Sequence, residues 1–248
     1  MARFETLHRM RAAASLLQPA KLAMRAFRCP ICGPSLLLRL SGEAIGVRCV
    51  RCAASAATLS LVSVLLQVRP GFRREALYEM SSRGPLLEFL RREAPRLTFS
   101  EYFDDVAPGA WRDGVQCQDV QRLTYPDRSF GVCTSTEVFE HVPDDALGFA
   151  EVRRALIPGG LFLFTVPLNP AAPTVERAVL RQGRVLHLLP PAYHDDRIRG
   201  RGAVLVYRDY GADITGRLLQ QGFTQAWIDQ RFNTAFLGYG ANVVAALA

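Results

Sequence analysis

The sequence contains no run of 18 apolar residues, so no segment of it predicts a transmembrane helix. Charges are scattered through the first 27 residues, which therefore lack the uninterrupted apolar block of a secretory signal peptide. Internal repeats and low-complexity tracts are also lacking, which argues against a repeat architecture or a biased, unfolded chain. We therefore expect a cytoplasmic protein with no membrane span.

Lysine is nearly lacking, because a single one of the 30 basic residues is Lys and the others are Arg. The net charge of +7 is uneven: residues 1–74 carry +10, whereas residues 75–248 carry −3. Such asymmetry is typical of contact with nucleic acid or an acidic surface, but an arginine-rich solvated face gives the same pattern. RNA therefore stays open as a partner of the N-terminal third.

With 248 residues and 49% hydrophobic residues, the chain can form one large domain, or a domain plus a small module. Residues 1–26 predict a basic helical segment that packs on its own domain or anchors to an acidic surface. Its apolar positions recur at spacings of three and four: Leu7, Met10, Ala14 and Leu17. The turn-forming residues 69–71 suggest a boundary between a small unit, 27–70, and a main domain, 71–248.

Two cysteine pairs with zinc-ribbon spacing occur in the small unit: Cys29, Cys32, Cys49 and Cys52. Two residues between paired cysteines allow both thiolates to reach one ion. A hairpin of residues 36–40 and 45–48, with a turn at 41–43, would bring the second pair opposite the first. Four thiolates leave no open position on the ion, so we expect structural zinc that supplies about 10 kcal/mol of folding energy.

Other interpretations of the four cysteines are two disulfides, which a cytoplasmic location disfavours, or plain core residues. Cys117 and Cys133 lie in apolar runs and are expected to be buried. A zinc ribbon does not specify function: it can bind RNA, contact a protein or brace a catalytic domain. The apolar residues 53–68 predict a connecting helix.

The main domain alternates between strand-like and helix-like segments, the pattern of a parallel α/β sheet. The predicted strands are 76–80, 97–101, 115–117, 130–135, 161–168, 223–230 and 242–248, and the predicted helices are 86–93, 145–156 and 209–221. In such sheets, ligands bind outside the carboxyl ends of the strands. Asp119, Glu137 and His141 fall at those ends.

Residues 119–145 read DVQRLTYPDRSFGVCTSTEVFEHVPDD, and LIPGG follows at 156–160. This order of motifs closely resembles the class I S-adenosylmethionine-dependent methyltransferases of the type 11 group, tightly over residues 119–168 and loosely over 75–248. The resemblance implies a Rossmann-like, seven-stranded, mainly parallel sheet with helices on both faces and a final antiparallel pair. Two departures are Gly131, where the family usually has Asp, and a degenerate glycine-rich loop that keeps one glycine, Gly84.

The resemblance implies S-adenosylmethionine as cofactor and assigns its binding to Glu79, Ser81, Gly84, Glu101, Asp119, Val120 and Glu137. Glu101 would accept bonds from the ribose hydroxyls, because a carboxylate accepts two donors at once. Asp119 would accept a bond from the adenine amino group, beside the Val120 backbone. Arg83 could pair with the cofactor carboxylate. The alternatives are a surface Glu101 and a domain that no longer binds the cofactor.

Three residues are candidates for acceptor binding or proton removal. His141 can act as a general base because its pKa lies near neutrality, or it can hold its loop in a structural role. Tyr193 and His194 lie in an insertion, 169–202, that either recognises the acceptor or is a plain surface loop. His194 with Asp195 and Asp196 could instead bind a metal, but a third ligand at a useful spacing is missing.

These observations predict a methyltransferase that acts on an oxygen or nitrogen of a small molecule or sugar intermediate. Such chemistry needs little dedicated acid–base machinery, and the sequence shows no Ser/His/Asp triad. One alternative is a non-catalytic zinc-ribbon binding protein with a degenerate methyltransferase-like domain. The other is an rRNA methyltransferase. The oligomeric state is not indicated.

Overall fold

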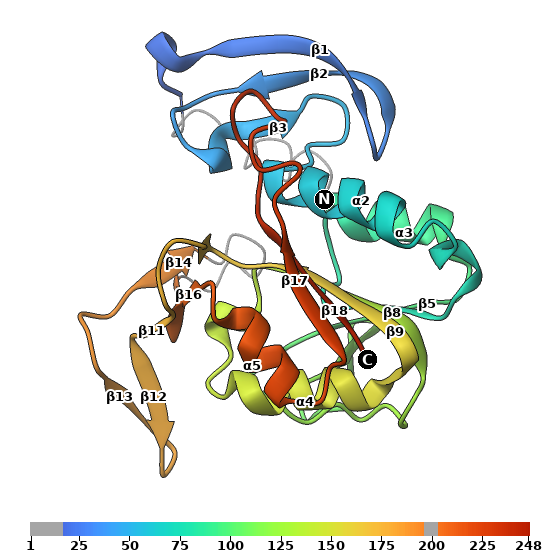
Figure 1. Cartoon of the computed structure of the whole chain (residues 1–248), viewed down its shortest axis with the longest axis vertical. Helices are drawn as coiled ribbons and strands as arrows, with labels where there is room; N and C mark the ends of the chain where they lie inside the picture. The colour runs from blue at the N-terminus through green and yellow to red at the C-terminus, as the bar shows by residue number, and fades with distance from the viewer. Residues whose placement is uncertain (1–16, 196–202) are drawn as a thin grey trace.

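The computed structural model describes residues 17–195 and 203–248, which form a small three-stranded module above an α/β domain (Figure 1). Most of the helix predicted for the N-terminal segment lies outside the described residues. Within the described residues, Pro19–Lys21 forms the 3-10 helix η1 and Ala23–Cys29 forms strand β1. The helix prediction is therefore wrong for residues 23–26. These residues belong to β1, which pairs with β2 over its full length.

The small module is an antiparallel sheet in the order β1-β2-β3, with β2 at Gly33–Arg39 and β3 at Val47–Cys49. The predicted hairpin is confirmed in β2 and β3, which are joined through the 3-10 helix η2, Ala44–Gly46. The predicted connecting helix follows as α2, Ala56–Val68. Ser55 caps it, because the Ser55 side chain accepts a hydrogen bond from the Thr58 amide at 3.2 Å.

The main sheet has eight strands in the order β17-β18-β9-β8-β4-β5-β7-β6. Their bounds are β4 Leu77–Glu79, β5 Leu97–Glu101, β6 Trp111–Arg112, β7 Val115–Cys117, β8 Phe130–Thr136, β9 Leu156–Thr165, β17 Gln225–Asp229 and β18 Val243–Leu247. The neighbouring strands β9, β8, β4, β5 and β7 are parallel to one another. At one edge of the sheet, β18 pairs antiparallel with β9, and β17 pairs antiparallel with β18. All seven predicted strands are present, the two-residue β6 is added, and the predicted fold class is confirmed.

Successive side chains of a strand point to opposite faces of the sheet, and in these strands both sets are apolar. Helices therefore cover both faces. Leu161 and Leu163 of β9 join the core formed by α2 and by α3, Pro85–Glu93. Phe162 and Phe164 join the opposite core, under α4, Asp145–Ala155, and α5, Ile214–Gln220. No helix in the described part of the chain is both long and apolar enough to cross a membrane.

Strand β9 begins at Leu156, earlier than the predicted residue 161. Phe130 pairs with Leu156 and Val132 with Leu161, so the Pro-Gly-Gly turn at 158–160 forms an irregularity inside the strand. The helix predicted at 209–221 is wrong at its start, because Arg208–Gly211 forms strand β16. A side chain on Gly211 would collide with the backbone of residues 172–174, which shows how closely two chain segments approach there.

The described part of the insertion, residues 169–195, contains several short strands. They are β10 Leu168–Asn169, β11 Val175–Glu176, β12 Ala178–Arg181, β13 Arg184–His187 and β14 Tyr193–Asp195. β16 lies between β10 and β11, and β12 pairs with β13 in an exposed hairpin. β14 pairs with β15, Ala203–Leu205. Two 3-10 turns complete the fold: η3 at Phe72–Arg74 and η4 at Phe139–His141.

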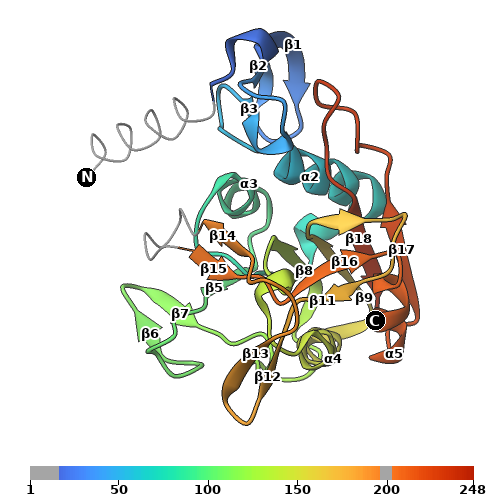
Figure 2. The ribbon, with the colours of Figure 1, turned by 90° about the vertical axis from the view of Figure 1, so that its left-hand side faces the viewer.

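The small module is fixed to the main domain by the connection between β17 and β18, which reaches up to it (Figures 1 and 2). The Tyr239 hydroxyl donates to the Gly42 carbonyl at 2.7 Å, and Arg25 donates to the Ala235 carbonyl at 3.0 Å. Ile31 and Leu37 of the module belong to the same apolar core as α2 and β9. The module and the sheet therefore share one core.

Candidate functional site

A cleft of about 1480 Å³ runs along the carboxyl ends of β4, β5, β7 and β8. It is lined by every residue predicted to bind cofactor or acceptor: Glu79, Ser81, Gly84, Glu101, Asp119, Val120, Glu137, His141, Tyr193 and His194. The structure thus gathers in one place residues that lie 115 positions apart in the sequence. Their individual roles stay predictions.

Glu79 ends β4 at the point where the strand order reverses between β4 and β8, the usual ligand position of such sheets. Its side chain is buried, and Thr134 of β8 donates a short hydrogen bond to its carboxyl group. Burial raises the pKa of Glu79 to about 8, and nearby Glu101 adds to the rise. Glu79 is therefore largely protonated at neutral pH unless a cationic group binds beside it.

The loop after β4 is held by serines in place of the glycines expected there. The Ser81 hydroxyl donates to the Arg83 carbonyl at 3.1 Å, and the Ser82 hydroxyl donates to Glu101 at 3.0 Å. Gly84 has φ of +96°, which requires glycine, and no atom lies within 4 Å of where a Cβ would be. Pro85 then begins α3, whose first amides are left facing this space.

Glu101 and Asp119 lie where the resemblance places contacts to the cofactor nucleoside. Glu101 accepts from Ser82 on one oxygen and from the Tyr102 amide on the other, at 3.3 Å. Asp119 accepts from the amide and the side chain of Gln121, both on the same oxygen, at 2.9 and 3.2 Å. A carboxylate has about four acceptor positions, so each of these groups is suited to accept bonds from several hydroxyl or amino donors. These two hydrogen-bond acceptors fit the hydroxyl and amino donors of the nucleoside part of S-adenosylmethionine.

Glu137 follows β8 with φ of +53°, an uncommon conformation for a residue other than glycine. Its amide donates to the Thr165 carbonyl at 2.9 Å, which holds the turn. The side chain lines the cleft and is exposed there, while the surrounding protein limits the solvation of its carboxyl group. Poor solvation, together with the charge of Glu140, raises the pKa of Glu137. Backbone strain and a perturbed carboxyl group at one residue favour a functional role.

His141 and His194 meet although 53 residues separate them. Their rings contact edge to face with centroids 5.1 Å apart, and a ring nitrogen of each lies 3.7 Å from Glu140 Oε1. The nearby carboxylate of Glu140 raises the pKa of His194. Tyr193 lines the cleft and is 54% exposed. Glu140 is not among the site residues predicted from the sequence, although its spacing from Glu137 and His141 was an available signal.

The metal alternative proposed for His194 used Asp195 and Asp196 as neighbouring ligands. Asp196 lies outside the described residues. The groups that join His194 come instead from η4. Sequence spacing could not show this, because the contact depends on the path of the insertion.

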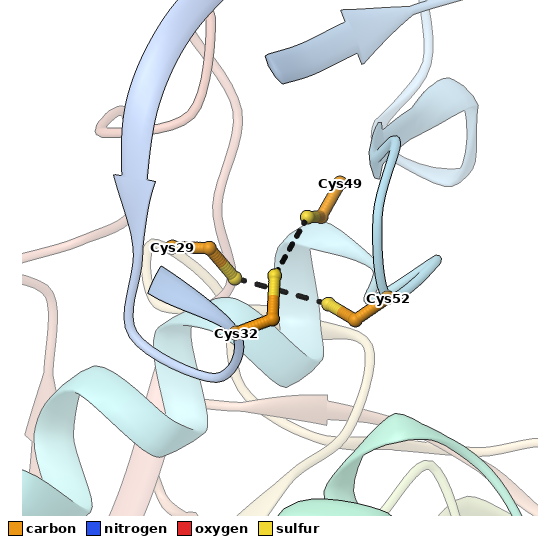
Figure 3. Close-up of side chains that lie close together, drawn as sticks. All are labelled: Cys29, Cys32, Cys49 and Cys52. Carbon is orange, nitrogen blue, oxygen red and sulfur yellow. Dashed lines mark hydrogen bonds between the residues drawn. The ribbon is translucent and has the colours of Figure 1, made fainter. Parts of the chain in front are cut away.

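The four cysteine sulfurs converge at the end of the small module (Figure 3). Cys29 and Cys52 lie 3.8 Å apart and Cys32 and Cys49 lie 3.6 Å apart, measured between sulfurs. Zn–S bonds of about 2.3 Å place tetrahedral sulfurs about 3.8 Å apart, whereas a disulfide needs about 2.05 Å. The cluster therefore fits a zinc ion and excludes disulfides. Ser35 contacts the Cys49 sulfur at 3.2 Å and can orient it.

The small module also reaches the cleft, which the sequence did not indicate. Ala44, Ile45 and Arg48 line one side of it. Cys117 and Cys133 lie away from the sulfur cluster and are completely buried, as expected. The module thus contributes both a cysteine cluster and part of the wall of the cleft.

Comparison with known proteins identifies the class of the main domain. Residues 78–164 match the family described as methyltransferase domain. The predicted methyltransferase domain is confirmed for this stretch. The match covers β4 to β9 and with them Glu79, Glu101, Asp119 and Glu137.

Similar curated proteins share part of this domain. The ubiquinone biosynthesis O-methyltransferase of Coxiella burnetii (strain RSA 493) is 31% identical over 80 residues, 32% of this chain and 34% of that protein. The protein of the same name from Pseudomonas aeruginosa (strain LESB58) is 42% identical over 69 residues, 27% of this chain and 29% of its own. The chain therefore matches about a third of the length of these relatives.

Similar solved structures include an S-adenosylmethionine-dependent methyltransferase from Mesorhizobium loti, with a TM-score of 0.47 and 18% identity. The similarity covers 76% of this chain and 98% of that one. The glycopeptide N-methyltransferase MtfA, solved with S-adenosylmethionine, gives a TM-score of 0.48 at 20% identity, over 77% of this chain and 92% of its own.

Proposed function

We propose that this protein transfers a methyl group from S-adenosylmethionine to an oxygen or nitrogen atom of a small-molecule acceptor. The observation that carries the proposal is the set of acidic residues after β4, β5, β7 and β8. Glu79, Glu101, Asp119 and Glu137 all line one cleft at the strand-order reversal of a methyltransferase domain. This is where such folds bind ligands.

In this proposal, Glu101 holds the ribose hydroxyls, and Asp119 with the Val120 backbone holds the adenine. Glu79, Ser81 and the loop at Gly84 hold the amino-acid end. When bound, S-adenosylmethionine supplies a methyl group on a positively charged sulfur. A cleft rich in carboxyl groups favours such a cation, and it would draw the proton from Glu79.

His141, Tyr193 and His194 form the acceptor side of the cleft. They come from η4 and β14 and line the same cavity as the residues assigned to the cofactor. Either histidine can accept a proton from a hydroxyl or amino group when its imidazole is neutral. Holding donor and acceptor in line can contribute several kcal/mol, up to about 7 to 11 kcal/mol. The oxygen acceptor named for the curated relatives supports a small hydroxylated substrate.

We also propose that the four cysteines hold a structural Zn²⁺ ion. Four thiolates leave no coordination position for substrate. The ion would stabilise the module that shares its core with α2 and that lines the cleft through Ile45 and Arg48.

The test is calorimetric titration of the zinc-loaded chain with S-adenosylmethionine and S-adenosylhomocysteine. We expect micromolar binding that weakens at least tenfold in Glu101→Ala and in Asp119→Ala, because each loses a charged hydrogen-bond acceptor. Asp127→Ala is the matched control, since Asp127 is exposed and outside the cleft. No binding to folded protein up to millimolar cofactor would refute the proposal and favour a non-catalytic role centred on the zinc ribbon.

A further inference from the structure

The carboxylate of Glu140 is buried, and the charged or ionisable groups nearest to it are two histidines. The residue is 1% exposed, and within the described residues neither carboxylate oxygen has a hydrogen-bond partner. Leaving a buried charged group unpaired is costly, so such a group in a folded protein calls for an explanation. A bound cation is one of the few ligands that can compensate the negative charge shared by the two oxygens.

Two imidazole nitrogens face this carboxylate. His141 Nε2 and His194 Nδ1 each lie 3.7 Å from Glu140 Oε1, which is longer than a hydrogen bond. The other nitrogen of His141, Nδ1, lies 2.8 Å from the Leu205 carbonyl, which can only accept. Neutral His141 therefore carries its hydrogen on Nδ1 and presents the lone pair of Nε2 to Glu140. Histidines that bind metals commonly donate their second nitrogen in this way.

We propose that Glu140, His141 and His194 bind a divalent transition-metal ion, such as Zn²⁺ or Mn²⁺, at the acceptor side of the cleft. Their ligand atoms lie within 4.8 Å of one another. Bonds of about 2.0 to 2.2 Å place adjacent ligands about 3.0 to 3.5 Å apart, so small inward rotations would complete the site. Two nitrogens and one carboxylate suit such ions better than Ca²⁺, which prefers oxygen ligands alone.

The position of this site indicates what the ion would do. Both histidines line the cleft, so the three protein ligands leave coordination positions open towards it. Together with the proposed methyl transfer, on which this step rests, the ion selects a hydroxylated acceptor. A cation favours the deprotonated oxygen, whose proton passes to solvent or to Glu137. The oxygen–carbon bond then forms as the sulfur–carbon bond breaks, and S-adenosylhomocysteine leaves.

The site can be tested without measuring activity. The full chain, with zinc already bound at its cysteines, is titrated with Co²⁺ and followed by equilibrium dialysis and visible absorption. We expect one Co²⁺ per chain, with weak ligand-field bands and without the intense bands of a thiolate–cobalt site. His194→Ala and Glu140→Gln should each weaken binding at least tenfold. His187→Ala is the matched control, because His187 is exposed on β13.

The proposal is overturned if the zinc-loaded chain binds no Co²⁺, or if both variants bind it as tightly as the wild type. Unchanged zinc content and melting temperature would show that the variants are folded. The titration with S-adenosylmethionine separates this inference from the proposed function. Cofactor binding without Co²⁺ binding refutes the metal site alone, whereas Co²⁺ binding without cofactor binding refutes the methyl transfer and leaves the metal site standing.

Discussion

Replacing Glu79 with Gln should remove much of the pH dependence of stability near neutrality. Glu79 is 1% exposed, and burial raises its pKa to about 8 from an ordinary value of 4.5. The folded state therefore holds this proton more tightly than the unfolded state does. Its stabilising effect is complete below about pH 4.5 and is lost as the pH rises through about 8.

The size of the effect follows from the shift. Each pKa unit corresponds to about 1.4 kcal/mol, so the full loss across the titration is about 5 kcal/mol. Between pH 6 and pH 7.5 the wild type should lose about 2 kcal/mol through this group. Gln has the same shape, stays neutral, and can still accept the hydrogen bond from Thr134.

Urea unfolding of both proteins, zinc-loaded and free of cofactor, at several pH values between 6 and 8 measures the difference in unfolding free energy. The difference cancels the titration of the cysteine ligands, which both proteins share. It should move in favour of the variant by about 2 kcal/mol from pH 6 to 7.5. Glu88→Gln, at an exposed position of α3, is the control. Parallel curves for wild type and Glu79→Gln would refute a raised pKa at Glu79.

Three further predictions concern the zinc ion, a buried arginine and a glycine of the main sheet. Removing zinc with a chelator should lower the melting temperature by more than 10 °C, because Cys49 lies in the core shared with α2. Calorimetry combined with zinc analysis tests this, and an unchanged melting curve would contradict it. Arg208→Met should destabilise by about 3 to 5 kcal/mol in urea unfolding, because buried Arg208 lies beside Asp145 and donates hydrogen bonds to three carbonyls of residues 139–143. Arg153→Met, at a solvent-facing position of α4, should change little. Gly131→Asp should lower the unfolding free energy by about 1 to 3 kcal/mol, because the new side chain collides with Glu75. The double variant with Glu75→Ala should regain most of this stability, and no gain would refute the collision.

The strands of the main sheet could be predicted from the sequence because buried parallel strands are short apolar runs bounded by turn residues. The predicted bounds of β5 and β7 agree with the structure at both ends. Acidic residues at strand ends pointed to one edge of the sheet, since parallel strands end together. The same logic located Glu79, Glu101 and Asp119 in one cleft.

Segments whose partners lie far along the chain were harder to predict. Residues 23–29 are exposed for much of their length and carry no clear period of two, and their strand conformation comes from pairing with β2. Residues 208–211 continue into α5 without a proline, and pairing with β10 and β11 makes them a strand. Local propensity is weak in both places, so tertiary contacts decide the structure.

The convergence of Glu140, His141 and His194 illustrates the same limit at the site. The first two residues are adjacent, but His194 arrives through β14, whose pairing with β15 also brings the Leu205 carbonyl to His141. No spacing rule relates residues separated by an insertion of short strands. A buried carboxylate is also indistinguishable from a surface one in sequence, because Glu is usually exposed.

The two departures from the methyltransferase pattern both have local structural explanations. Gly131 leaves space that the side chain of Glu75 fills, and Glu75 is held there by Arg69 at 2.8 Å. In the loop after β4, residues 80–83 all avoid positive φ, so the backbone requires glycine at Gly84 alone. The serine contacts to Glu101 hold the rest of the loop. Loss of the triple glycine is therefore compatible with an intact cleft, and it gives no reason by itself to infer a degenerate, non-binding domain.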